Sequence, residues 1–181
     1  MKNVIKYPLV LGTISVVCAL ALGIVYDITN PIIVARENAV AVAAMSELVP
    51  ESTDAEVITS DYDNVSNYGI TAIYKAYKND DTIAYGFQAE GSGMKTGIVI
   101  LFVVSAVNDE FIGVKPISNS ETSGYGADYL AEAEFAASFA GLSFDNVDTG
   151  IDKNSGVTVT YDGVHRMATS VIDFYLENIK A

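Results

Sequence analysis

The sequence predicts an α+β fold: a single N-terminal transmembrane helix, then an extracytoplasmic domain in which helices pack on an antiparallel sheet. Three observations predict it: an uncharged apolar run at residues 9–26, β-prone runs between residues 70 and 117, and helical periodicity near the C-terminus. Because the chain has 181 residues, the part after the apolar run is long enough for one domain with its own core. The predicted parts of the chain are a short N-terminal segment (residues 1–8), the transmembrane anchor (residues 9–26) and the extracytoplasmic domain (residues 27–181).

The apolar run has about the length that crosses the hydrocarbon core of a bilayer. Lys2 and Lys6 precede it, and Asp27 follows it. By the positive-inside rule, we expect a short cytoplasmic N-terminus, one span in the cell membrane, and a C-terminal domain on the extracytoplasmic side.

Two other interpretations of the apolar run are open. A signal peptide would be cleaved just after it, but residues 23–27 (GIVYD) contain no small-x-small cleavage pattern. A lipid-modified Cys18 would need a small residue before it, and Val17 stands there. We therefore expect an uncleaved anchor.

After the anchor, the Ala-rich run 38–48 stops before Pro50 and predicts a short helix. Residues 50–67 show little periodicity and predict a loop. The β-prone runs 70–77 and 82–90 flank Asn79, Asp80 and Asp81, a pattern typical of a β-hairpin.

The next apolar run, residues 97–107, is too short to span a membrane as a helix, and its Ile, Val and Phe content favours a buried strand. Residues 111–117 are expected to pair back against it. Residues 127–140 predict a helix that ends at Gly141.

A C-terminal amphipathic helix follows, with Thr160 or Asp162 as its expected N-cap. The turn before it contains Ser155, Gly156 and Thr158, so hydroxyls and free backbone N–H groups would lie at a helix N-terminus, which favours a phosphate. Taken alone, such a turn is more often an ordinary capped turn. The buried face of the helix follows the i, i+3, i+4, i+7 pattern: Val164, Met167, Ala168, Val171, Ile172, Tyr175, Leu176 and Ile179.

A second polar turn lies at residues 120–126 (SETSGYG). Gly124 and Gly126 carry no Cβ, so the backbone there can turn sharply and approach a flat ligand. Glu121 and Thr122 would supply an acceptor and a hydroxyl, and the ring of Tyr125 could stack on the ligand. The simpler alternative is a tight turn with Tyr125 in the core.

Together these features resemble the extracytoplasmic FMN-binding subunits of two complexes: the G subunit of the Rnf complex and the C subunit of the sodium-translocating NADH:quinone reductase. Residues 121–126 (ETSGYG) resemble the family's E-T-P-G-L-G, and residues 152–160 (DKNSGVTVT) resemble its D-x-x-S/T-G-A-T-x-T/S. Residues 27–33 (DITNPII) resemble the segment just past the family's membrane helix. The resemblance covers most of the chain.

The resemblance implies that Thr158 carries FMN through a phosphoester bond, placed there by a flavin transferase that uses FAD. It also implies an electron-transfer subunit of an ion-pumping redox complex rather than a stand-alone enzyme, with other membrane subunits as partners. Asp152 would belong to the flavinylation signal. The other implied cofactor-binding residues are Ser155, Gly156, Val157, Thr160, Glu121, Thr122, Gly124, Tyr125 and Gly126.

Three residues depart from the family pattern: Val157 replaces the usual alanine, Ser123 the proline and Tyr125 the leucine. Val157 adds a β-branched side chain where the transferase must approach, and Ser123 leaves its turn without a fixed φ. These changes bear on modification efficiency and redox potential, but they leave the hydroxyl of Thr158 in place.

The amino-acid composition excludes several classes of partner and cofactor. The formal net charge is −13, and removing the two positive charges of Lys2 and Lys6 leaves −15 for the predicted outer domain. Such a surface repels nucleic acid and anionic lipid headgroups. Cys18, the sole cysteine, lies in the apolar run, and His165, the sole histidine, is expected at the surface, so we expect neither haem nor an iron–sulfur or other metal site.

Two other functions are open at this point. One is an FMN carrier in a different extracytoplasmic electron-transfer chain, which neighbouring genes would distinguish. The other is a membrane-anchored binding domain without a cofactor. In that case Thr158→Val would change stability only by the contribution of a helix cap, about 1 kcal/mol.

Overall fold

The computed structural model describes residues 2–151 and 156–180. The chain separates into two compact units, Met1–Glu37 and Asn38–Ala181. Helix α1 (Lys2–Leu48) forms the described part of the first unit and continues into the second. The helix predicted at 38–48 is therefore the end of α1 and not a separate short helix, since Pro31 removes only one backbone hydrogen bond from a helix that otherwise continues.

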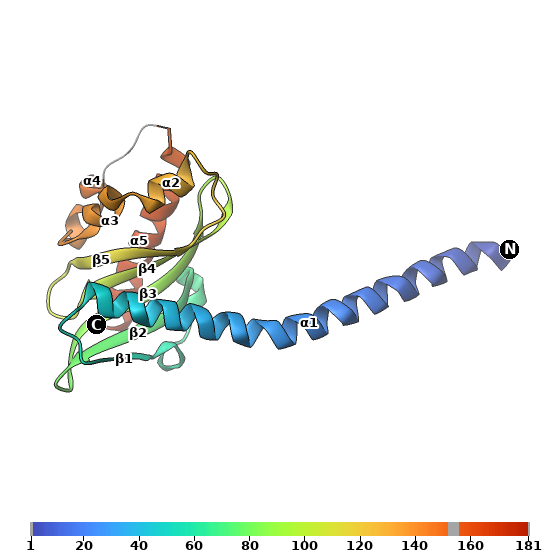
Figure 1. The fold of residues 1–181 in the computed structure, drawn as a ribbon, viewed down its shortest axis with the longest axis horizontal. Helices are drawn as coiled ribbons and strands as arrows, with labels where there is room; N and C mark the ends of the chain where they lie inside the picture. The colour runs from blue at the N-terminus through green and yellow to red at the C-terminus, as the bar shows by residue number, and fades with distance from the viewer. Residues whose placement is uncertain (1, 152–155, 181) are drawn as a thin grey trace. The chain divides into compact units, whose positions relative to one another are not determined.

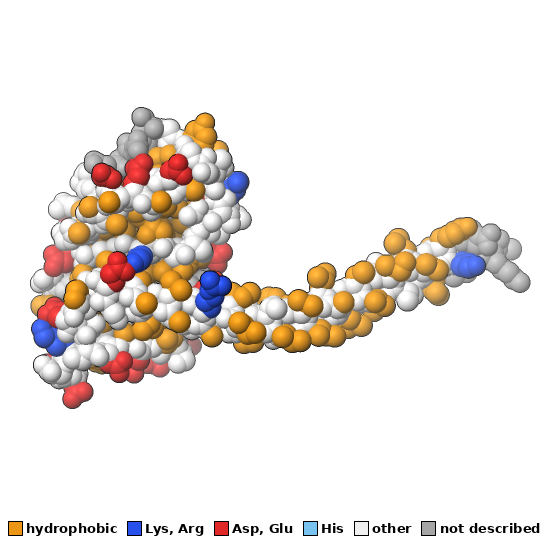
Figure 2. All heavy atoms as spheres, viewed as in Figure 1, with side chains coloured by type: hydrophobic (Ala, Val, Ile, Leu, Met, Phe, Trp, Pro, Cys, Tyr) orange, Lys and Arg blue, Asp and Glu red, His pale blue; other side chains and the backbone are white. Residues whose placement is uncertain are grey.

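The part of α1 in the first unit is long and apolar enough to cross a membrane. Its large apolar side chains are exposed in the chain alone (Figure 2). Leu22, for example, is exposed to 71% and Ile32 to 66%. The hydroxyls of Thr13, Ser15 and Thr29 donate to carbonyl oxygens four residues back at 2.8–3.0 Å. These polar side chains therefore need no external partner in an apolar surrounding.

The second unit is built on one antiparallel sheet whose strands follow chain order (Figure 1). The β2–β3 hairpin turns at Asn79 and Asp80, both at positive φ, as a tight hairpin requires. The α+β prediction and the four predicted strands are confirmed. The strands are β1 (Asp54–Val57), β2 (Ile70–Lys78), β3 (Asp81–Ser92), β4 (Thr96–Ser105) and β5 (Phe111–Ser118).

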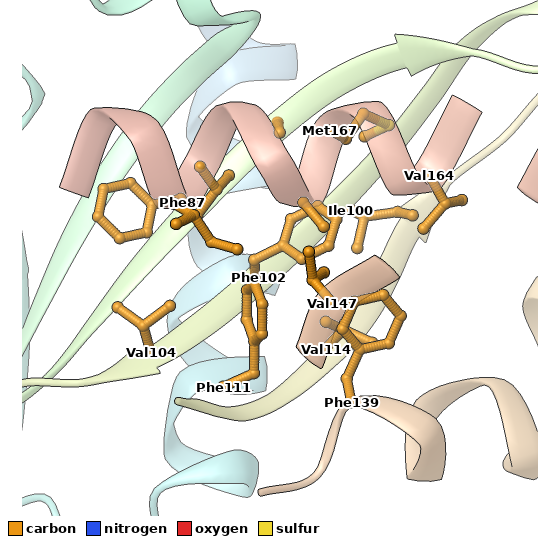
Figure 3. Packing of buried hydrophobic residues seen from close by; sticks show 14 of the residues in the cluster. Phe87, Ile100, Phe102, Val104, Phe111, Val114, Phe139, Val147, Val164 and Met167 are labelled. Carbon is orange, nitrogen blue, oxygen red and sulfur yellow. The ribbon is translucent and has the colours of Figure 1, made fainter. Parts of the chain in front are cut away.

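Helices cover both faces of the sheet. On one face, Met45 near the end of α1 packs in a cluster that includes Leu101 and Val103 of β4. On the other face, the alternate β4 residues Ile100 and Phe102 join the core formed with α5 (Thr158–Asn178) (Figure 3). Burial on both sides explains why β4 reads as a continuous apolar run and not as an alternating one.

The core on the α5 side is rich in aromatic rings. Phe111 and Phe139 meet edge to face with centroids 5.5 Å apart, and Phe102 and Phe139 meet at 5.8 Å. The predicted buried face of α5 is confirmed except at Leu176, which is 40% exposed, and at Ile179, which is the C-cap and only partly buried. Burial raises the pKa of Tyr175, whose hydroxyl donates to the carbonyl oxygen of Ser105 at 3.2 Å.

Two predicted elements were wrong in part. The loop predicted at 50–67 contains the short edge strand β1 and two 3₁₀ turns, η1 (Thr59–Asp61) and η2 (Val65–Tyr68). The helix predicted at 127–140 is interrupted at Glu132, whose backbone is extended (ψ 140°). The smaller elements in that part of the chain are α2 (Gly126–Ala131), α3 (Ala133–Phe139), η3 (Phe144–Asn146) and α4 (Val147–Gly150).

Candidate functional site

Three segments that are distant in sequence meet around the carboxylate of Glu121, which is only 8% exposed. Its Oε1 accepts a hydrogen bond from the backbone N–H of Lys95 at 2.8 Å, in the turn between β3 and β4. Its Oε2 accepts one from the hydroxyl of Thr160 at 3.0 Å, in the first turn of α5. We refer to Lys95, Glu121 and Thr160 as the Glu121 clasp.

Two glycines allow the segments to approach this closely. A Cβ on Gly126 would lie 2.4 Å from Oε2 of Glu121 and 2.5 Å from Oγ1 of Thr160. A Cβ on Gly93 would lie 2.8 Å from Cα of Thr160 and 2.9 Å from Oε1 of Glu121. The close backbone approach expected at Gly126 is therefore present, but the group approached is a carboxylate of the chain itself.

Helix α5 begins at Thr158, whose side chain is exposed. Its N-cap is Val157, which makes no side-chain capping bond, and the N–H of Tyr161 donates to the carbonyl of Val157 at 2.9 Å. The earlier N–H groups of the first turn consequently lack intrahelical acceptors and lie at the positive end of the helix dipole.

The predicted caps, Thr160 and Asp162, were wrong. Thr160 lies inside the helix, 1% exposed, and its hydroxyl is engaged by Glu121 and not by the start of the helix. Gly156, just before the helix, has a φ of +99° and is exposed. Asp152 and Ser155 lie outside the described residues.

After Glu121, the loop before α2 presents residues 122–125 to solvent. The carbonyl of Thr122 accepts the N–H groups of Tyr125 at 3.2 Å and Ala127 at 3.3 Å, and Gly124 has a φ of +84°. The ring of Tyr125 is 57% exposed, so the alternative that placed it in the core is wrong. Ser123, in place of the family's proline, donates its hydroxyl to Asp128 at 3.4 Å.

Each of the three segments carries an exposed apolar side chain next in sequence to the clasp or to Gly126. Met94 is 63% exposed, Tyr125 57% and Val159 51%. Each is the chain neighbour of a residue in or against the clasp: Lys95, Gly126 and Thr160 respectively. We call Met94, Tyr125 and Val159 the apolar rim. A phosphate binds N–H groups that have no acceptor within their helix, as at the start of α5, and exposed apolar side chains such as these suit a flat apolar ring.

Sequence reasoning missed the β3–β4 turn. Lys95 takes part through its backbone N–H, which every residue but proline has, so its residue type carried no signal. Gly93 was the available signal, because a glycine beside a short turn between two strands marks close backbone approach.

His165 lies in α5, after Thr160, and is partly exposed. Its Nε2 lies 2.9 Å from a carboxylate oxygen of Asp148, which links α5 to α4. Its ring stacks on that of Tyr161 with centroids 6.1 Å apart.

No protein-family model matches the sequence. Curated relatives include the G subunit of the ion-translocating oxidoreductase complex of Cereibacter sphaeroides strain ATCC 17023, 28% identical over 84% of this chain and 75% of the relative. The G subunit of Methanosarcina acetivorans is 26% identical over 95% of this chain and 90% of the relative. That of C. sphaeroides strain ATCC 17029 is 27% identical over 84% and 75%. The predicted resemblance to the G subunit of the Rnf complex, an ion-translocating oxidoreductase complex, is confirmed.

Proposed function

From its relationship to the G subunits of ion-translocating oxidoreductase complexes, we propose that this chain is a membrane-anchored electron-transfer subunit with FMN bound covalently to Thr158. The relatives' name supports a place in a redox-driven ion-translocating complex. The apolar helix supports one membrane span. The charges of Lys2 and Lys6 support a cytoplasmic segment at residues 1–8 and an extracytoplasmic domain at residues 27–181.

One observation carries the proposal: the two sequence motifs meet in space. Glu121 of the first motif bonds Thr160 of the second across 39 residues of sequence. Thr158 is exposed at the start of α5, where the N-cap residue Val157 makes no side-chain capping bond. Thr158 lies one position past the N-cap, so its hydroxyl is not placed to cap the helix.

The residues present fit FMN. The first-turn N–H groups of α5 would hold the phosphate, and the positive end of the helix dipole offsets its charge in an otherwise acidic domain. The apolar rim of Met94, Tyr125 and Val159 would face the ring system. When bound, FMN supplies reversible uptake of one or two electrons, and the chain's own groups set its exposure to water.

Attachment requires a partner enzyme, a flavin transferase that uses FAD. The hydroxyl oxygen of Thr158 forms a new bond to the phosphorus of the FMN half, and the P–O bond of the pyrophosphate breaks. AMP leaves with the electron pair of that bond, and the hydroxyl proton goes to a base of the transferase. Val157 packs against the core and is only partly exposed, so its branched side chain is directed away from this approach.

The test is intact mass spectrometry, with in-gel flavin fluorescence, of the full chain co-expressed with a flavin transferase. We expect the wild type to gain one FMN less one water in a form that survives denaturation. Thr158→Val should gain nothing, whereas Thr158→Ser, which keeps a hydroxyl, should retain the modification. Thr71→Val changes an exposed threonine on β2, outside both motifs, and serves as the matched control. An unmodified wild type, or a fully modified Thr158→Val, would overturn the proposal.

An FMN carrier in another extracytoplasmic electron-transfer chain would use the same site. The names of the relatives favour the ion-translocating complex. Co-purification of the full chain with other membrane subunits of such a complex tests that preference, and a chain that purifies alone from its native membrane would contradict it.

A further inference from the structure

We propose that the Glu121 clasp positions Thr158 for flavin transfer, and that Glu121 is a positioning residue that does not contact the flavin. This inference rests on the proposed function, because it concerns how the attachment threonine is presented to the transferase. The resemblance to the family places Glu121 only near the cofactor. The geometry gives it a different task.

Burial and bonding direct the carboxylate inward. Glu121 is the one charged residue among the buried side chains of the described part of the chain. Each of its oxygens accepts a hydrogen bond, from Lys95 N–H and from the Thr160 hydroxyl. An ionised carboxylate only accepts hydrogen bonds, so two donors match it, and burial strengthens both bonds. Gly93 and Gly126 lie so close to these groups that a Cβ on either would clash with the carboxylate.

The clasp anchors the start of α5 through a side chain of its first turn. The start of a helix without a side-chain cap tends to fray, and Val157 provides no such cap. Thr160 is fixed instead by Glu121, and Thr158 precedes Thr160 by two residues. The position of the attachment hydroxyl is therefore set by a long-range bond to the loop before α2 and, through Lys95, to the β3–β4 turn. A nucleophile held in one place reacts faster than one that moves.

The experiment follows flavin transfer in vitro on the full chain purified without FMN, with the transferase and FAD added. Four variants are compared with the wild type: Glu121→Ala, Glu121→Gln, Thr160→Val and Tyr175→Phe. Initial rates over a range of acceptor concentration separate kcat from KM. Hydrogen exchange of the β3–β4 turn and of the first turn of α5 measures whether the clasp still holds these segments, independently of flavin transfer. Thermal unfolding measures the stability of each variant.

We expect Glu121→Ala and Thr160→Val to lower kcat about tenfold or more, with faster exchange at Lys95 and at the first turn of α5. Glu121→Gln should stay near the wild type, because its amide oxygen can accept from Lys95 while its amide N–H donates to Thr160. Tyr175→Phe loses a buried hydrogen bond at the far end of α5, so it should lower the unfolding temperature without changing kcat.

A folded Glu121→Ala with wild-type kcat would overturn the inference. So would a Glu121→Gln as slow as Glu121→Ala, because that result would assign the effect to charge and not to position. If Glu121→Ala does not fold, Thr160→Val decides, since it removes one hydrogen bond at nearly constant shape. A wild type that accepts no flavin at all would instead refute the proposed function.

Discussion

At the scale of single residues, the unusual feature is a buried carboxylate in a strongly acidic chain. Charged groups are seldom buried unless they are paired or fully hydrogen-bonded, because desolvation costs several kcal/mol. Glu121 meets that condition through two donors from different segments. The sequence alone could identify Glu121 as a candidate, but it could not reveal this bonding, because one donor is a backbone group and the other is a threonine whose position favours a helix cap.

A substitution at Gly126 tests the closeness of that contact. Gly126→Ala would place a methyl group 2.4 Å from Oε2 of Glu121, so the loop or helix must move. We expect a loss of about 1–3 kcal/mol in the free energy of unfolding, measured by urea denaturation of the full chain in detergent. Gly124→Ala is the control: its Cβ would meet no atom within 4 Å, and its positive φ costs about 1 kcal/mol without disturbing the clasp. A Gly126→Ala variant more stable than Gly124→Ala would contradict the geometry.

At the scale of elements, the periodicity of apolar residues was sufficient to predict those strands and helices whose buried faces follow that periodicity. Strands β2 to β5 and the buried face of α5 were predicted because their apolar residues match the geometry of the faces they bury. Strand β1 was missed because three of its four residues are exposed and it exists only by pairing with β2. The break at Glu132 was missed because the Ala-rich residues around it favour a helix, and tertiary packing overrides that preference.

The contact between the end of α1 and the sheet can be tested at Met45, which is fully buried within the second unit. Met45→Ala should lower the free energy of unfolding by about 2–4 kcal/mol, because it removes transfer free energy and leaves a cavity against β3 and β4. Val40→Ala, at a position that is 44% exposed on the same helix, should change it by less than about 0.5 kcal/mol. Equal effects of the two substitutions in urea denaturation would contradict this packing.

At the scale of the whole molecule, the proposed function depends on which side of the membrane the domain occupies. We expect a cysteine introduced at the exposed Ser60, in a Cys18→Ser background, to react with a membrane-impermeant maleimide in intact cells. A cysteine at Lys6, before the apolar run, should react only after the membrane is opened. The reverse labelling pattern would place the domain in the cytoplasm and contradict the predicted topology.

The central claim is that one residue, Thr158, carries the flavin. The most direct measurement is fragmentation mass spectrometry of the tryptic peptide that follows Lys153 and ends at Arg166, from the chain purified after co-expression with a flavin transferase. The account predicts FMN on Thr158, with Thr160 and Tyr161 of the same peptide unmodified. A peptide without flavin, or with the flavin on Thr160, would contradict it.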